Sequence, residues 1–321
     1  MPRAFIPMLF VHIPKTAGTS FRNGVQRYLG PDRMVVDYGP KQSITSNLVR
    51  KWRYEDRQPA KLRHAFDVQG KKFLSGHIQL LDYVGYFDLY SVATFLRDPV
   101  QRVISEYHHF VRHYGFRESL EDFAQIPNFQ NKQSKALGGI DIEQLGFVGI
   151  VEHYEDSLAI LNQHFGWEVP SLVTNMGRKQ LSENYKIPRQ TRQLIEDHNH
   201  LDSILYRQAS ERIYRNDRTG ETAAPEPASG ACRLISKNLL RGWACCIASE
   251  RPTLVRIYIN GEQHAELYAT QYRPEIQKKG IKRSGCAGFD LDLPELKSGD
   301  EVRCVDAHSG RNLSNSPLTV V

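Results

Sequence analysis

The stretch from Leu9 to Phe21 constrains this chain more than any other part of its sequence. An apolar run from Phe5 to Val11 is typical of a buried strand, and it ends at Pro14, which cannot continue a sheet ladder. A loop rich in hydroxyl groups follows, and apolar residues recur at helical spacing from Phe21 onwards. Backbone N–H groups and the helix dipole favour an anion at such a helix start, and Lys15 adds a full positive charge. The stretch therefore predicts a site for a phosphate or a sulfate-like group.

Three further strands are expected at 72–77, 89–96 and 147–151, where short apolar runs end in polar residues. The first delivers His77 to its end, and the second leads into Arg97 and a proline suited to the first turn of a helix. Helices are expected at 22–30, 101–113, 120–125, 128–137, 156–165, 188–195 and 201–214, with a polar, partly helical insertion at 32–69. This alternation indicates a three-layer α/β domain with a parallel sheet, whose strand carboxyl ends present ligand-binding residues.

The last third of the chain has a different pattern. Residues 216–231 contain no large apolar side chain, which is the composition of a linker. Short strands are expected at 253–259, 263–268, 288–293 and 301–305, with Asn260-Gly261 as a strong hairpin signal. These strands predict a small antiparallel β-sandwich. The expected domain organisation is an α/β domain at 1–216, a linker at 217–231 and a β-sandwich at 232–321.

Composition narrows the class of protein. The formal net charge of +6 is not gathered in a basic tail, so nucleic acid is not an expected partner. No apolar run reaches the roughly 18 residues that a membrane span needs. The anion loop begins close to the start of the sequence and leaves no room for a removable leader, so we expect a cytoplasmic protein. The five cysteines lack metal-ligand spacing and are expected to be buried, reduced thiols.

The anion loop differs from the loop of nucleoside-triphosphate hydrolases. The Walker A pattern places lysine directly after its second glycine, whereas Lys15 precedes Gly18 here. A hydrolase of this class is therefore disfavoured. A nucleotide kinase stays an alternative, and it would use ATP in a magnesium-dependent manner.

Residues 12–21, His-Ile-Pro-Lys-Thr-Ala-Gly-Thr-Ser-Phe, resemble the 5′-phosphosulfate loop of sulfotransferases. The similar branch contains heparan sulfate 2-O-sulfotransferases and their bacterial PAPS-dependent relatives. Residues 95–107 resemble the 3′-phosphate motif of that family, and His77 follows Ser75-Gly76 where its 2-O-sulfotransferase-like members place a catalytic histidine. Asn131, Gln133 and residues 148–152 are also similar, and the resemblance covers residues 5–215 in the correct order.

The resemblance implies a sulfotransferase fold, similar to that of P-loop nucleoside triphosphatases, and 3′-phosphoadenosine 5′-phosphosulfate (PAPS) as the sulfuryl donor, without a metal. Lys15 at the bridging oxygen and His77 as base would be catalytic. The implied cofactor-binding residues are Lys15, Thr16, Ala17, Gly18, Thr19, Ser20, Arg97 and Ser105. In-line sulfuryl transfer needs positioning, charge stabilisation and a base, and these residue types supply all three.

Several assignments stay open at this point. His77 has an alternative interpretation as a structural strand-end residue, and His12 competes as base, although strand alternation favours packing around the loop. Glu152 is interpreted as a carboxylate at a helix start or as another base, and Arg102 as a solvated helix residue. Two residues of a later loop, Arg178 and Lys179, are further candidates for cofactor contact.

The β-sandwich has a resemblance of its own. Residues 240–244, 272–276 and 288–289 look like an accessory β-sandwich found on some bacterial glycan-modifying transferases. Trp243 is expected in the small core rather than stacked on a sugar. The expected function is therefore transfer of a sulfuryl group to a hydroxyl of a carbohydrate. Sulfation of tyrosine or of a small metabolite is one alternative, and a glycan-binding protein with an inactive transferase half is another. The oligomeric state is left open.

Overall fold

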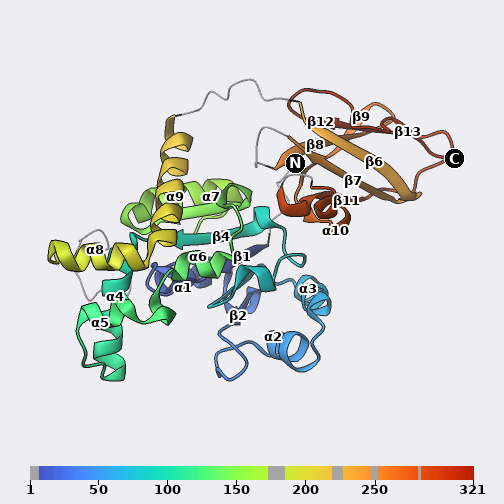
Figure 1. The fold of residues 1–321 in the computed structure, drawn as a ribbon. Helices are drawn as coiled ribbons and strands as arrows, with labels where there is room; N and C mark the ends of the chain where they lie inside the picture. The colour runs from blue at the N-terminus through green and yellow to red at the C-terminus, as the bar shows by residue number, and fades with distance from the viewer. Residues whose placement is uncertain (1–6, 173–184, 219–226, 247–251, 281–282) are drawn as a thin grey trace. The chain divides into compact units, whose positions relative to one another are not determined.

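The structure is a computed structural model that describes residues 7–172, 185–218, 227–246, 252–280 and 283–321 (Figure 1). The chain forms two compact units. The first contains residues 1–86, 91–139 and 146–219, and the second contains 87–90, 140–145 and 220–321. The expected boundaries at 216 and 231 stay a prediction. Helix α9 ends at Arg218 and strand β6 begins at Ser229.

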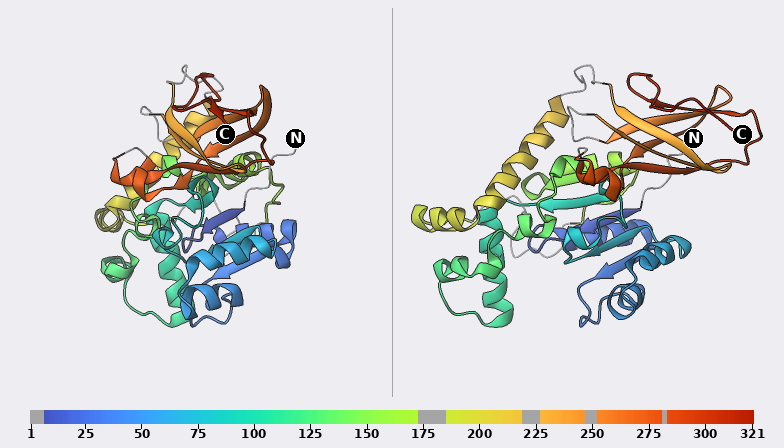
Figure 2. Two further views of the ribbon diagram at one scale, coloured as in Figure 1. Left: turned by 90° about the vertical axis from the view of Figure 1, so that its right-hand side faces the viewer. Right: turned by 45° about the vertical axis from the view of Figure 1, so that its right-hand side comes forward.

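A five-stranded sheet is the centre of the first unit, and all of its strand pairs are parallel. The strands are β1 (Met8–Val11), β2 (Met34–Asp37), β3 (Phe73–Gly76), β4 (Val92–Leu96) and β5 (Phe147–Ile150). Their order is β2-β3-β1-β4-β5, so the chain leaves β1 toward one side of the sheet and later returns to its other side. Open α/β sheets bind ligands at the carboxyl ends of the strands where the strand order changes direction, which here are the ends of β1 and its neighbours. Figure 2 shows the sheet from two further directions.

The helices of this unit are α1 (Gly18–Leu29), α2 (Asn47–Val49), α3 (Pro59–Val68), α4 (Pro99–Tyr114), α5 (Leu120–Gln125), α6 (Lys132–Leu137), α7 (Tyr154–Phe165), α8 (Arg189–His198) and α9 (His200–Arg218). The predicted α/β class is confirmed. The single helix expected at 128–137 is wrong, because Asn131 has a positive φ of 50° and α6 begins only after it. The amide oxygen of Asn131 instead accepts the backbone N–H groups of Leu201 and Asp202 at the start of α9.

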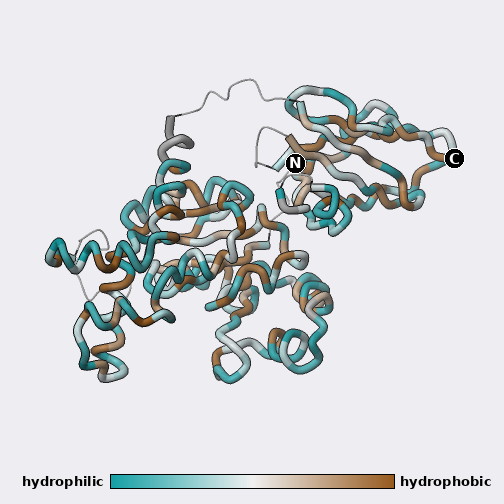
Figure 3. The backbone as a smooth tube through the Cα atoms, in the orientation of Figure 1, coloured by the Kyte–Doolittle hydropathy of each residue, from teal (hydrophilic) through white to brown (hydrophobic). Residues whose placement is uncertain are grey.

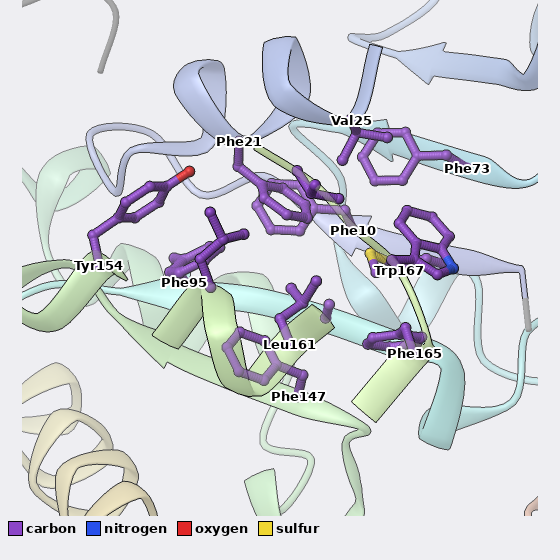
Figure 4. Close-up of a cluster of buried hydrophobic side chains, with 14 of the residues drawn as sticks. Phe10, Phe21, Val25, Phe73, Phe95, Phe147, Tyr154, Leu161, Phe165 and Trp167 are labelled. Atoms are coloured by element: carbon purple, nitrogen blue, oxygen red, sulfur yellow. The ribbon is translucent and has the colours of Figure 1, made fainter. Parts of the chain in front are cut away.

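The core of the first unit lies between the sheet and two helices (Figure 4). Phe21 of α1 packs on Phe10 of β1 with ring centroids 4.6 Å apart, and Leu161 and Phe165 of α7 join the same cluster. Figure 3 shows apolar residues along the strands and a largely hydrophilic α8. Burial of this aromatic cluster fixes α1 on the sheet and with it the loop that precedes α1.

The second unit contains two four-stranded antiparallel sheets, of order β10-β11-β7-β6 and β13-β12-β8-β9. Its strands are β6 (Ser229–Ser236), β7 (Leu239–Cys245), β8 (Thr253–Ile259), β9 (Glu262–Ala269), β10 (Gln271–Tyr272), β11 (Cys286–Asp292), β12 (Glu301–Asp306) and β13 (Leu318–Thr319), with one short helix, α10 (Pro274–Lys278). The predicted antiparallel sandwich is confirmed. Side chains from both sheets share one core, as Phe289 and Val255 illustrate. Trp243 is partly buried against Ile276.

The cysteines agree with the sequence-based expectation in their burial. Cys232, Cys245, Cys286 and Cys304 are buried, whereas Cys246 is partly exposed. Among the helices of the described ranges, none combines the length and the apolar character that crossing a membrane requires.

Gly76, the last residue of β3, is expected to be essential for the sheet. A Cβ at this position would lie 1.6 Å from the carbonyl oxygen of Asp37 on β2, so Gly76→Ala must push two paired strands apart. We expect a loss of about 3 kcal/mol in the free energy of unfolding, measured by urea denaturation.

Gly115→Ala is the matched control, since Gly115 has a φ of 66° but no neighbouring atom within 4 Å of its virtual Cβ. This change should cost only about 1 kcal/mol, from left-handed backbone strain. Equal losses in the two variants would contradict the close packing at Gly76.

Candidate active site at the carboxyl ends of the parallel strands

Each strand of the parallel sheet is followed by a polar side chain. In the order of the sheet, the five residues are Tyr38, His77, His12, Arg97 and Glu152, the first four directly after their strands and Glu152 one residue further on. The register pairs Val11 with Gly76 and Gly76 with Asp37, so the residues that follow these three positions are neighbours. The parallel pairing therefore gathers side chains that are far apart in the sequence.

The loop between β1 and α1 has an unusual backbone. Lys15 and Ala17 have positive φ values of 70° and 60°, and Ala17 is the N-cap of α1 without a side-chain cap. The hydroxyl of Thr16 does not cap the helix either, because it donates to the carbonyl oxygen of Ile13 at 2.9 Å. The first N–H groups of a helix have no partner within the helix, and turns of this kind direct such groups toward a single point. The loop is thus built to hold an anion at the start of α1.

Gly18 is required by the packing of this loop. A Cβ at Gly18 would lie 2.1 Å from Cδ2 of the His12 ring. The ring is 6% exposed and lies against the first residue of α1. The His12 ring therefore packs against the end of the loop at Gly18, which agrees with its interpretation as a packing residue.

Two cations meet at the loop. Arg97 is 8% exposed and its Nη1 donates to the carbonyl oxygen of Lys15 at 3.3 Å. Its Nε is buried and has no hydrogen-bond partner among the described residues. Lys15 is half-buried and forms no ion pair with a carboxylate in the described part of the chain. Burial lowers the pKa of Lys15, and the charge of Arg97 lowers it further. A bound anion would supply the missing partner for both groups.

Arg97 is held in place through its backbone. Its N–H donates to Oε1 of Gln133 and its carbonyl oxygen accepts from Nε2 of the same amide, both at 2.9 Å. The next residue, Asp98, caps α4 by accepting from the N–H of Gln101 at 2.9 Å. The planar guanidinium is therefore presented by a rigid strand–helix junction.

Glu152 has a bracing role in the structure. Its Oε1 accepts from the N–H of Asp98 at 3.1 Å, and its Oε2 accepts from the hydroxyl of Tyr206 at 3.1 Å. Burial raises the pKa of this carboxyl group. The contacts join the ends of β4 and β5 to α9, so the carboxylate is already occupied by structural hydrogen bonds.

The interpretation of Arg102 as a solvated helix residue is wrong. Arg102 is completely buried, and its Nη1 lies 2.5 Å from Oε2 of Glu106. The other oxygen of Glu106 lies 2.5 Å from Nζ of Lys132 on α6. Ser105, the neighbour of Glu106 on α4, is half-buried. Helical spacing alone did not identify this side of α4 as buried.

His77 lies between two other rings at the end of β3. Its centroid is 4.7 Å from those of both His12 and Tyr38. His77 is exposed to solvent on its remaining side. His12 is buried, and its Nδ1 forms a hydrogen bond with the Tyr38 hydroxyl, 2.9 Å away. Desolvation, followed by the charges of Lys132 and Arg22, lowers the pKa of His77 to about 4. Burial, followed by the charge of His77, lowers the pKa of His12 to about 3.

Sequence reasoning missed three residues of this site: Arg22, Tyr38 and Lys132. Gln133 was noted only as part of a resemblance, without a role. Tyr38 was missed because β2, an edge strand of four residues, lies in the segment that was expected to be an irregular insertion. Arg178 and Lys179 lie outside the described residues.

Comparison with known proteins now bears on this geometry. The family model of the sulfotransferase family matches residues 5–219. The sequence matches none of the curated proteins with which it was compared.

Two solved structures align with it. A sulfotransferase from Alicyclobacillus acidocaldarius is 16% identical, with 65% of this chain and 96% of that chain covered and a TM-score of 0.36. Mouse sulfotransferase SULT7A1 complexed with PAP is 8% identical, with 66% of this chain and 90% of that chain covered and a TM-score of 0.41. The family model spans more than half of the chain and includes every strand-end residue described above, and the chain therefore belongs to the sulfotransferase family.

Proposed function

We propose that this sulfotransferase moves a sulfuryl group from PAPS to a hydroxyl group of a carbohydrate, with His77 as base. The observation that carries the proposal is the meeting of Lys15 and Arg97 at the uncapped start of α1, where the buried Nε of Arg97 has no partner among the described residues. Two neighbouring cations with unused donors fit a donor molecule that carries several negative charges.

Different residues of the site would bind different groups of the donor. The backbone N–H groups and hydroxyls from Thr16 to Ser20 would hold the 5′-phosphate, and Lys15 would lie at the oxygen that bridges phosphate and sulfate. Arg97 and Ser105 would hold the 3′-phosphate. When bound, PAPS supplies the sulfuryl group, and negative charge develops on the leaving phosphate oxygen as the bridging bond breaks. Lys15 stabilises that charge.

His77 is the better of the two candidate bases. It is exposed, and its lowered pKa keeps it unprotonated at neutral pH. His12 is buried and its Nδ1 is committed to Tyr38, so it has no route to an acceptor hydroxyl. In the proposed step the acceptor oxygen forms a bond to sulfur, and its proton passes to His77.

A carbohydrate acceptor is supported by the position of His77 at the end of β3, which resembles that of the histidine in 2-O-sulfotransferases. We further propose that residues 1–216 form the transferase domain and that the β-sandwich at 232–321 is an accessory domain. Tyrosine and small-metabolite acceptors use the same loop, and the acceptor panel below separates them.

Replacement of Lys15 is expected to slow transfer. Lys15→Ala removes the charge that meets the leaving group, so kcat/KM should fall by roughly 10²- to 10³-fold. The measurement is transfer of radiolabelled sulfate from PAPS. Lys41→Ala, at an exposed lysine outside the site, is the control and should leave the rate unchanged. An unchanged rate in Lys15→Ala would refute the assigned role.

The pH dependence follows from the pKa of His77. A base acts only when unprotonated, so kcat/KM should be flat around neutral pH and fall as the pH drops through about 4. His77→Gln should lower kcat by roughly 10²-fold or more and abolish this limb of the profile. His64→Gln, at an exposed histidine of α3, is the control. Persistence of the acidic limb in His77→Gln would assign the base to another group.

The acceptor class is tested with the intact protein, radiolabelled PAPS and a panel of glycans, tyrosine peptides and small phenols. We expect label in glycans. Label only in peptides or phenols would replace the carbohydrate proposal. Glycan binding without transfer to any acceptor would support the non-catalytic alternative, and magnesium-dependent use of ATP would support a kinase.

A further inference from the structure

The three rings at the ends of β2, β3 and β1 form a unit that the proposed reaction does not explain. We infer that Tyr38, oriented by Arg22, is a positioning residue for His77: with His12 it flanks the His77 ring on two sides, and its hydroxyl places the proton of His12 on Nε2. The inference rests on the proposed function of His77 as base.

The sheet register brings the rings together. Gly76 pairs with Val11 on one side and with Asp37 on the other, so His77 emerges between His12 and Tyr38. The backbone N–H of His12 donates to the carbonyl oxygen of Gly76 at 3.0 Å, which continues the pairing beyond the strand. Backbone hydrogen bonds thereby set the place in the sheet from which each ring projects.

Ring contacts restrict His77 on two sides. The plane of His77 is inclined by 73° to that of His12 and by 67° to that of Tyr38, at centroid distances of 4.7 Å in both cases. The hydroxyl of Tyr38 also reaches Nδ1 of His12 at 2.9 Å, so the two flanking rings are bonded to each other. The two rings therefore limit the orientations that His77 can adopt on these sides.

Arg22 decides the direction of the hydrogen bond between Tyr38 and His12. Nη1 of Arg22 donates to the Tyr38 oxygen at 2.9 Å, and its guanidinium carbon lies 5.6 Å from the centroid of the Tyr38 ring. A phenol oxygen that accepts from a cation is a better donor, so its own proton is directed to Nδ1 of His12. The neutral His12 ring then carries its proton on Nε2, on the side that faces Gly18.

The backbone of Tyr38 is anchored independently of any ligand. The buried Asp37 accepts from the hydroxyls of Tyr54 and Tyr83 at 2.7 Å and 2.6 Å. The N–H of Tyr38 itself donates to the hydroxyl of Thr45 at 3.0 Å. Because these bonds exist within the protein, His77 is oriented before the acceptor binds, which saves entropy in the transition state.

The charged and titratable groups around His77 come from four other elements: His12 after β1, Arg22 of α1, Lys132 of α6 and Glu106 of α4. Removal of the Tyr38 hydroxyl alters none of these charges. The effect of Tyr38 should therefore appear in kcat, without a shift of the acidic limb of the pH profile.

The kinetic test compares Tyr38→Phe and Tyr38→Ala with Tyr114→Phe, which removes a hydroxyl from a residue that is 69% exposed. Tyr38→Phe should lower kcat about tenfold, or ~1.4 kcal/mol, with unchanged KM for PAPS. Tyr38→Ala also removes the ring contact and should lower kcat further, to about a hundredth. Tyr114→Phe should behave as the unmodified protein. Full kcat in Tyr38→Phe, or a loss matched by weaker donor binding and a lower unfolding temperature, would overturn the inference.

A second test needs no turnover, and so it distinguishes failure of this inference from failure of the proposed function. Long-range ¹H–¹⁵N NMR spectra of the full chain report which nitrogen of a histidine carries the proton, and the signals of His12 are identified by their loss in His12→Gln. We expect a proton on Nε2 of His12 in the unmodified protein and a mixture of tautomers in Tyr38→Phe. A proton on Nδ1 in the unmodified protein, or identical spectra for the two, would overturn the inference.

Discussion

The pairing of β1 with β3 on one side and β4 on the other is the interaction on which the site depends. It aligns Val11 with Gly76 and with Thr94, and the Thr94 hydroxyl donates to the carbonyl oxygen of Val11 at 2.8 Å. The anion loop leaves the sheet one residue beyond this point. A shift of register on either side would separate the loop from His77 or from Arg97, because each of these residues directly follows its own strand.

The distribution of charge explains why these cations are available. The two carboxylates nearest to them are occupied, since Glu106 is shared by Arg102 and Lys132, and Glu152 accepts from Asp98 and Tyr206. Among the described residues, Lys15 therefore forms no ion pair with a carboxylate, and the buried Nε of Arg97 has no hydrogen-bond partner. A bound anion would relieve the repulsion between these two partly buried cations, which is what the proposed donor site requires.

The sequence predicted the parts of the molecule that local pattern controls. The apolar run before Pro14, the strand that ends at Arg97 and the hairpin at Asn260-Gly261 all have strong local signals, and the α/β and antiparallel classes follow from them. The parts that depend on tertiary contacts were not predictable in this way. Tyr38 needs an edge strand whose apolar run is only Met34 to Val36. Arg102 has the polarity of a surface residue but is buried, and two of its partners, the carbonyl oxygen of Phe129 and the carboxylate of Asp202 on α9, are distant in sequence.

Ala17 has a consequence for the energetics of ligand capture. The backbone energy of an alanine at a φ of 60° is about 1–2 kcal/mol higher than that of a glycine in the same conformation. Glycine, however, would let the unbound loop sample many more backbone conformations. Binding of an anion would then cost more conformational entropy. The small backbone strain at Ala17 therefore reduces the conformational entropy that the loop loses on binding. Because the loop has few accessible backbone conformations, it would favour a ligand whose shape fits the conformation that it already has.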